Sequence, residues 1–225
     1  MNSGRARKSG AEATWHEIVT EEERGQIMSS SELVSFRKGE TVIKQGTAAG
    51  QIYFLESGMV KLMSEHHNRM TAFKILADNS FVGLMCSFAQ RTFDFTAITI
   101  TPSLVRIIER DLIEHIIRNN GEFAMHVVEI MSVTTNKIVR DLIGLSHKHA
   151  EGAISTLLLE LAEIFDSNSY RLPFSRVELA DTAGYSKESV INCLSSLQRD
   201  GIISVSGKSV VIKDPERLQS IARHG

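Results

Sequence analysis

A short polar segment of this sequence contains the side chains that could do the most specific chemistry. Lys187 can donate hydrogen bonds to guanine, Glu188 can accept one from cytosine, and Asn192 can form two with adenine. The hydroxyls of Ser186 and Ser189 suit phosphate contacts, which position a protein on DNA without reading its sequence. On an isolated helix, a solvated polar face would be the better interpretation. The elements around the segment therefore decide between the two.

Those elements predict a helix-turn-helix. Ser175 and Glu178 have the spacing of a capping box, which starts a helix of about two turns. Ala180 is small where a second helix would cross, and Gly184 can adopt the left-handed backbone conformation of a turn. Ser186 is a good N-cap for that second helix. The apolar residues of the second helix recur at helical spacing and are Val190, Cys193, Leu194 and Leu197.

A strand pair is expected after the two helices. Residues 201–212 form two β-type runs around Ser206-Gly207-Lys208, which is typical of the wing of a winged helix-turn-helix. Lys208 in this turn and Arg176 at the start of the first helix are further candidates for contacts with DNA. Because capped helices, a small crossing residue, a turn glycine and a wing occur together, we predict that this region binds DNA.

Charge by itself does not indicate a nucleic-acid ligand. The 225-residue chain has a formal net charge of −2, and residues 146–225 contain nine Lys and Arg against ten Asp and Glu. A nucleic-acid-binding domain usually has a basic surface. The prediction therefore depends on where the charges lie, not on their sum.

The first half of the chain has a β pattern. Thr20 and Glu23 have capping-box spacing, which predicts a short helix after a polar start. Short apolar runs then recur about every ten residues, as in a sandwich, roll or barrel. The predicted strands are 41–43, 51–55, 59–63, 71–76, 95–100 and 104–108.

A helical pattern follows, with a short helix over 111–119, a long one over 122–145 and another over 150–165. The long helix, roughly 36 Å in length, has an apolar seam at the 3-4-3-4-3 spacing that faces a partner helix. The seam consists of Val128, Met131, Thr135, Ile138, Leu142 and Leu145. An ordinary helix packed on its own domain is the alternative. A second apolar stripe on the same helix favours the dimer, because one face can then pack on its own domain while the other contacts a partner helix. This stripe consists of Phe123, Val127, Ile130 and Thr134.

Most of the chain, from about Leu33 to Ile212, resembles the CRP/FNR superfamily of bacterial transcription regulators. Residues 36–46 and 52–62 resemble the first strands of the family's cyclic-nucleotide-type β-roll, 184–192 the start of its recognition helix, and 201–208 its wing.

The resemblance implies an α+β protein with an N-terminal β-roll (a double-stranded β-helix or jelly-roll), a dimerisation helix and a C-terminal winged helix-turn-helix. The expected parts are a flexible tail (1–13), a sensor β-roll domain (14–121), the dimerisation helix (122–146) and a DNA-binding domain (147–225).

The family also implies partners for this chain. A homodimer would place two helices in successive major grooves of a palindromic operator, about 34 Å apart. RNA polymerase and a small-molecule effector are further expected partners. By residue-by-residue correspondence, Ser186 and Ser189 would hold phosphates, while Lys187, Glu188 and Asn192 would meet base edges. Lys187 and Asn192 stand where the catabolite activator has arginines, so we expect weaker guanine reading and a shift toward adenine at Asn192.

The expected effector pocket departs from that of cyclic-AMP-binding members, which use a Gly-Glu pair for the ribose and an Arg for the phosphate. Here Gly83 is followed by Leu84. Arg91 and Thr92 resemble the second half of the motif, although an ungapped count puts Phe93 at the arginine position. A buried phosphate without a cation would be strongly disfavoured. We therefore expect that cyclic AMP is not the effector.

Two further pocket positions, Ile138 and Val139, lie where cyclic-AMP-binding members present hydroxyls to the base. Haem, nitric oxide or a redox change is a possible alternative signal. Met85 and Cys86 lie near the ligand position of haem-sensing relatives, although we favour packing roles for both. Other candidate haem ligands are His66, His67 and His149. The chain's two cysteines exclude a four-cysteine cluster within one chain, and no metal site is predicted.

Two other function classes share parts of this pattern. Metal-dependent oxygenases also use β-rolls, but they need imidazoles and a carboxylate around one metal. The adjacent His66 and His67 would point to opposite faces of a strand, so we predict no enzyme. The other class is a β-roll that regulates another protein, with a C-terminal domain that does not bind DNA. Without a long apolar run or a signal peptide, we expect a cytoplasmic protein that does not contact membranes.

Overall fold

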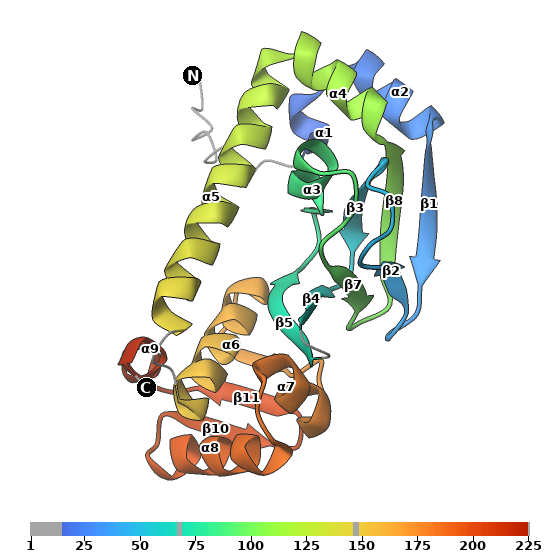
Figure 1. Ribbon diagram of the computed structural model, residues 1–225. Coiled ribbons are helices and arrows are strands. Elements are labelled where there is room, and N and C mark those ends of the chain that lie inside the picture. Colours follow the sequence, from blue (N-terminus) through green and yellow to red (C-terminus); the bar gives the residue numbers. More distant parts are fainter. Residues whose placement is uncertain (1–14, 67–68, 146–148, 225) are drawn as a thin grey trace, which may run out of the picture.

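The computed structural model describes residues 15–66, 69–145 and 149–224. Within these ranges the side chains of 66, 69–71, 137–138, 140–145 and 224 are not described. The predicted tail 1–13 and His67 lie outside the described residues. The chain forms a β-rich unit with a long helix along it, and a smaller unit of helices and a three-stranded sheet next to both (Figure 1). The predicted α+β class is confirmed.

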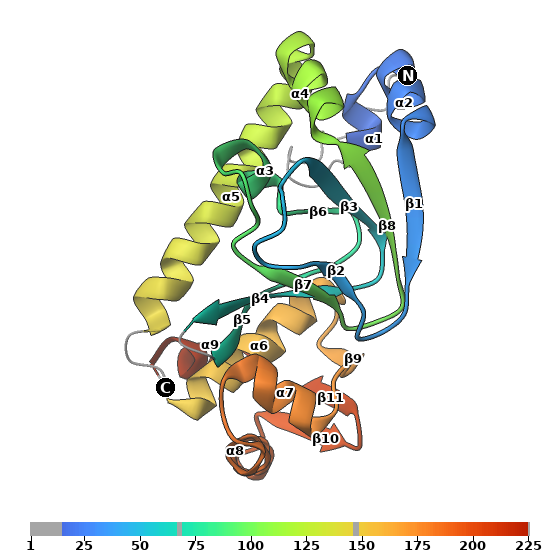
Figure 2. The same ribbon diagram turned by 45° about the vertical axis from the view of Figure 1, so that its right-hand side comes forward.

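Two four-stranded antiparallel sheets form the β-roll (Figure 2). The first has the order β1 (Ser31–Phe36), β8 (Ser103–Glu109), β3 (Gln51–Ser57) and β6 (Ser80–Val82). The second has the order β2 (Thr41–Ile43), β7 (Thr96–Thr99), β4 (Val60–His66) and β5 (Arg69–Leu76). The predicted strands are confirmed to within a few residues at their ends. The core of the roll includes Ile43, Leu55, Val60, Phe93 and Phe95.

Helices close one end of the roll. The predicted capping box at Thr20 is confirmed at the start of α2 (Glu21–Ser29), and α1 (Trp15–Ile18) precedes it. The predicted helix over 111–119 is α4 (Arg110–Asn119), and it ends before α5 (Gly121–Leu145). The side chain of Asn120 accepts a hydrogen bond from the Phe123 amide at 3.0 Å, which caps the start of α5. From this end α5 runs along the roll toward the C-terminal unit (Figure 1).

The C-terminal unit contains the predicted helix-turn-helix and wing. Its helices are α6 (Ala150–Ile164), α7 (Arg176–Ala183), α8 (Lys187–Arg199) and α9 (Pro215–His224). Its sheet has the order β10 (Ile203–Ser206), β11 (Ser209–Ile212) and β9 (Ser169–Arg171). Strand β9 and helix α9 are additions to the elements predicted from the sequence. Both pack on a core that contains Leu158, Leu194 and Leu218.

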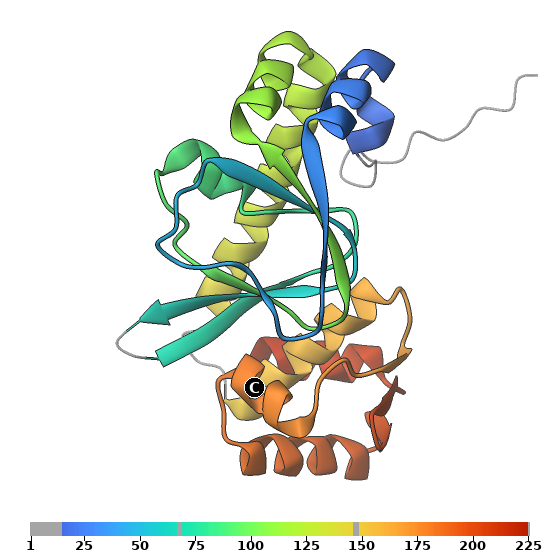
Figure 3. The ribbon, with the colours of Figure 1, turned by 90° about the vertical axis from the view of Figure 1, so that its right-hand side faces the viewer.

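The C-terminal unit packs against the β-roll. Helix α7 lies against β5, and Figure 3 shows the β4–β5 hairpin above the helices of this unit. Met59, Ile75 and Ile100 of the roll belong to the same apolar cluster as the C-terminal core. The ammonium of Lys38 lies 2.8 Å from a Glu178 carboxylate oxygen of α7. The two units are thus joined by an apolar contact with an ion pair beside it.

Among the described residues, no helix is both long enough and apolar enough to cross a membrane.

Candidate DNA interface and effector cavity

The start of α8 is built as the sequence predicts. Gly184 has a left-handed backbone with φ 77°, which completes the turn after α7. The Ser186 hydroxyl accepts a hydrogen bond from the Ser189 amide at 3.1 Å and so caps α8. Val190 and Leu194 are buried against the domain core. Because these apolar residues fix the inner face of α8, the other face of its first turns must point outward.

The predicted base-reading residues lie on that outer face. Lys187, Glu188 and Asn192 are all exposed, and α8 lies on the side of the unit away from the β-roll (Figure 1). Ile191 is 42% exposed beside them. An exposed apolar side chain here suits contact with the methyl group of thymine. Sequence reasoning did not select Ile191, although its place four residues after Lys187 puts it on the same helix face.

The predicted phosphate contacts fall into two groups. The hydroxyls of Ser186 and Ser189 lie 3.0 Å apart. Either can donate to the other, which leaves one hydroxyl hydrogen for a phosphate. Arg176 donates to the Gly207 carbonyl of the wing at 2.9 Å, and burial lowers the pKa of its guanidinium. Arg176 therefore positions the wing, at whose turn Lys208 is exposed. Its remaining N–H donors can still reach a phosphate.

A groove of about 650 Å³ lies between α8 and the wing. Its lining includes Arg176 from α7, Ile191 and Arg199 from α8, and Gly207 from the wing. Arg199 was not among the predicted DNA contacts, since its position at the far end of α8 gives no pattern in the sequence. Two guanidinium groups along one groove suit a DNA strand, because they neutralise phosphates. The basic groups are thus gathered locally although the region has more acidic than basic residues.

A second cavity, of about 350 Å³, lies between the β-roll and α5. Of the predicted effector-pocket residues, Gly83, Leu84, Met85 and Cys86 line it, at the start of α3 (Leu84–Ala89). The remaining lining residues are Leu62, Ser64, Phe73, Lys74, Leu76, Phe81, Asp94, Phe95, Ile130, Met131 and Thr134. We call this space the roll–helix cavity.

The other predicted pocket residues lie elsewhere. Arg91 and Thr92 are exposed, and the backbone of this segment pairs with residues 48–49. Val139 is 46% exposed and does not line the roll–helix cavity, while the side chain of Ile138 lies outside the described residues. Helix α5 reaches the cavity instead through Ile130, Met131 and Thr134. Thus the part of α5 that lines the cavity lies nearer the N-terminus of the helix than Ile138 and Val139, the positions that the family resemblance implied.

Aromatic rings fill the interior of the roll in front of Gly83. This glycine has φ 81°, and a Cβ atom at its position would lie 2.8 Å from Cε1 of Phe93 and 3.0 Å from Cζ of Phe95. Both phenylalanines are buried, and their ring centroids are 5.8 Å apart in an edge-to-face arrangement. Phe93 is therefore a core residue beside the glycine, while its neighbour Arg91 points to solvent.

The candidate redox and haem ligands are only partly brought together. Met85 and Cys86 both line the roll–helix cavity. Burial raises the pKa of the Cys86 thiol, which disfavours the thiolate that redox chemistry and metal binding need. His149 is exposed at the N-terminus of α6, and the side chain of His66 is not described. Within the part of the chain that the structure covers, no three His, Cys, Asp or Glu side chains form a metal-binding group.

The predicted dimer seam is exposed in part. Val128 is 52% exposed, and Thr135 is also exposed. Met125, which was not predicted, extends the seam by one turn at 58% exposure. Met131 instead packs against the core at the end of the roll and lines the roll–helix cavity. The seam positions Ile138, Leu142 and Leu145 have no described side chains.

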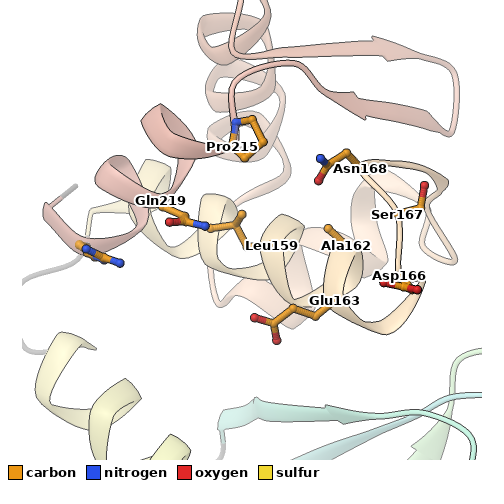
Figure 4. Close-up of a pocket in the computed structure, with 9 residues that line it drawn as sticks. Leu159, Ala162, Glu163, Asp166, Ser167, Asn168, Pro215 and Gln219 are labelled. Atoms are coloured by element: carbon orange, nitrogen blue, oxygen red, sulfur yellow. The ribbon is translucent and has the colours of Figure 1, made fainter. Parts of the chain in front are cut away.

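Another groove, of about 590 Å³, lies between α6 and α9 (Figure 4). Glu163 and Asp166 lie on one side, and Pro215 and Gln219 of α9 lie on the other. Glu163 already interacts within the chain. Arg223 also lines the groove, so it has two carboxylates against one guanidinium. This groove lacks the excess of basic groups found between α8 and the wing, and we do not include it in the candidate DNA interface.

Comparison with known proteins gives independent matches for both units. A cyclic nucleotide-binding domain model matches residues 33–120, and a Crp-like helix-turn-helix domain model matches residues 153–221. The chain is 26% identical over 196 residues to a CRP-like cAMP-activated global transcriptional regulator of Mycobacterium tuberculosis, which covers 84% of this chain and 88% of the relative. It is also 26% identical over 194 residues to the transcriptional activator protein anr of Pseudomonas aeruginosa, with coverage of 83% and 78%.

Among solved structures, the fold is similar to that of FixK2 from Bradyrhizobium japonicum. The TM-score is 0.76 at 22% sequence identity, and the match covers 87% of this chain and 98% of that chain.

Proposed function

The chain belongs to the CRP/FNR superfamily of DNA-binding transcription regulators, and from this premise we propose that it acts as a homodimer on a palindromic operator. The exposed, capped start of α8 is the observation that carries the proposal. Lys187, Glu188 and Asn192 meet base edges in the major groove, and Ser186 and Ser189 hold phosphates. The α8–wing groove, with Arg176 and Arg199, follows the DNA backbone. A regulator that acts on DNA in this way works in the cytoplasm, with RNA polymerase as a further partner, and not as an enzyme.

Dimerisation proceeds through α5. Met125, Val128 and Thr135 form an exposed stripe at a 3-then-7 spacing, which is the spacing of a helix–helix seam. Two exposed apolar side chains on this stripe are unfavourable in water, and a second copy of the helix would bury them. The twofold symmetry of such a pair would present two α8 helices to the two halves of a palindrome.

The proposed effector is not cyclic AMP. Leu84 follows Gly83 where a carboxylate would bind a ribose hydroxyl, and Phe93 and Phe95 pack against Gly83. Arg91 is exposed and does not line the roll–helix cavity. The M. tuberculosis relative is named as cAMP-activated, but a buried phosphate in this chain would lack a comparable arginine partner, which is unfavourable.

Selection of binding sites from random duplex DNA tests the proposal. We expect the purified protein to enrich a palindrome and to bind it with a steep salt dependence. The double variant Lys187→Ala, Glu188→Ala should bind the selected site at least about tenfold more weakly, since each good base contact contributes roughly 1–3 kcal/mol. The matched control is Lys213→Ala, Glu216→Ala, which removes the same charges from exposed positions of the same unit.

The control variant should bind like the unmodified protein. If the α8 double variant kept full affinity for the palindrome, base reading by Lys187 and Glu188 would be refuted. If no DNA were enriched, the regulatory β-roll without DNA binding would be the better account.

A further inference from the structure

We propose that the roll–helix cavity binds a neutral, largely apolar small molecule as the effector. This inference rests on the proposed function, because it assigns the chemical class of the signal that such a regulator senses. The cavity volume of about 350 Å³ lies within the range of small-molecule sites, roughly 300–1,000 Å³.

The lining favours an apolar occupant. Phenylalanine, leucine, isoleucine and methionine side chains make up most of the wall, and five different elements, β4, β5, β6, α3 and α5, contribute to it. They include Phe73 from β5, Phe81 from β6, Leu84 from α3 and Met131 from α5. Burial of apolar ligand surface against such a wall contributes roughly 25 cal/mol per Å². A ligand with hydrocarbon or aromatic surface therefore gains most from this site.

The charged groups disfavour an anion. Lys74 is the one cationic residue among the described residues that line the cavity, and Asp94 is the carboxylate. Lys74 already interacts within the chain, and Asp94 would repel a phosphate or carboxylate. A ligand with a net negative charge would lose its hydration without gaining a free cation.

Two hydroxyls allow one or two polar atoms on the ligand. Ser64 from β4 and Thr134 from α5 both line the cavity. Among the described side chains, the Ser64 hydroxyl has one long contact, 3.4 Å, with the Asp94 carbonyl. A hydroxyl or carbonyl of the ligand could therefore bond to it. The class that fits is a neutral aromatic or aliphatic compound with few polar groups.

Occupancy of this cavity is coupled to the dimer seam through α5. Met131 and Thr134 face the cavity, while Val128 and Thr135 on the same helix are exposed. A ligand that packs against the inner face of α5 would favour one rotation of the helix, and the outer face would turn with it. Such a ligand shifts DNA affinity only if it binds the two arrangements differently.

A neutral dye, N-phenyl-1-naphthylamine, tests the inference directly, because its fluorescence rises in apolar surroundings. We expect saturable binding by the full-length protein that excess cyclic AMP does not displace. Cys86→Phe places a ring into the cavity and should weaken dye binding by at least about fivefold. The matched control, Gln90→Phe, adds the same ring at the exposed end of α3 and should bind the dye normally.

Thr134→Phe fills the cavity from the opposite wall and provides a second test that does not depend on how α3 tolerates the change. Absence of saturable dye binding, dye binding by both cavity variants that equals that of the unmodified protein, or displacement of the dye by cyclic AMP would overturn the inference. So would an absorption band of added haem that depends on Cys86. Operator binding is measured in parallel: dye binding can fail while operator binding persists, which separates this inference from the proposed function.

Discussion

Replacement of Gly83 by alanine tests the packing on which the effector argument depends. Gly83 has φ 81°, a conformation that costs a residue with a side chain roughly 1–2 kcal/mol. The new Cβ atom would also lie 2.8 Å from Phe93 and 3.0 Å from Phe95. Both rings are buried in the core of the roll. Phe95 also lines the roll–helix cavity, whereas Phe93, the nearer ring, does not and so has little space to move.

The expected loss of stability follows from these two effects. Overpacking of a well-packed core costs roughly 1–3 kcal/mol, so Gly83→Ala should lower the free energy of unfolding by about 2–5 kcal/mol in total. Gly39 provides the matched control, because it has φ 88° with nothing within 4 Å of the added Cβ. Gly39→Ala should cost only the backbone part, roughly 1–2 kcal/mol.

Gly58→Ala should cause the largest loss in the free energy of unfolding among the three glycine variants. Its Cβ would overlap with the Ser103 hydroxyl oxygen and would lie 2.6 Å from the Pro102 carbonyl oxygen, and backbone atoms cannot rotate away.

Urea unfolding followed by tryptophan fluorescence measures these differences. Trp15 is the single tryptophan of the chain, and it is buried in the core at the helical end of the roll. Its emission therefore reports the unfolding of the unit that contains all three glycines. If Gly83→Ala and Gly39→Ala destabilised the protein equally, the rings would not press on Gly83. The argument against cyclic AMP would then rest on Leu84 and on the exposure of Arg91 alone.

Three further predictions concern the interfaces. Burial alone would raise the pKa of Glu178, but hydrogen bonds from Lys38 and from the capping box, with the charge of Lys38, lower it to about 2. This carboxylate thus stabilises the fold above its unfolded-state pKa of 4.5, and the contribution is lost as pH falls from there toward 2. In urea unfolding, the difference in free energy of unfolding between wild type and Glu178→Gln should therefore shrink over that pH range. Ser186→Ala should cost about 1 kcal/mol of stability through the lost cap, whereas Ser186→Asp should keep the cap and still weaken DNA binding in fluorescence anisotropy, because its charge repels phosphate. Val128→Glu should give monomers by analytical ultracentrifugation, while Leu33→Glu, an equally exposed apolar-to-acid change on β1, should leave the dimer intact.

The features predicted correctly from sequence are those with local causes. The capping boxes at Thr20 and Ser175, the cap at Ser186 and the turn at Gly184 each depend on residues within four positions of one another. Local hydrogen bonds and backbone preferences therefore decide these structures before any tertiary contact forms. The helix-turn-helix was predictable for this reason.

The missed elements are short or are held by distant contacts. Strands β6 and β9 have three residues each, too few for a periodic pattern, and each depends on a partner strand far along the chain. The roll–helix cavity brings Phe81 and Met131 together across 50 positions. The direction of Arg91 likewise depends on pairing with residues 48–49. No window of sequence contains this information, so the pocket could be predicted only in part.

The contact between Lys38 and α7 has a mechanical consequence. Glu178 accepts hydrogen bonds both from Lys38 and from the Ser175 amide at 2.6 Å, so the same carboxylate caps α7 and ties it to the β1–β2 turn. Rotation of the C-terminal unit about the end of α5 would break this ion pair and, at the same time, expose the apolar side chains of Met59 and Ile75 to water. Small excursions would therefore cost energy with no compensating contact. We therefore expect the C-terminal unit to occupy a few discrete orientations relative to the β-roll and to switch between them, not to rotate continuously about a flexible hinge.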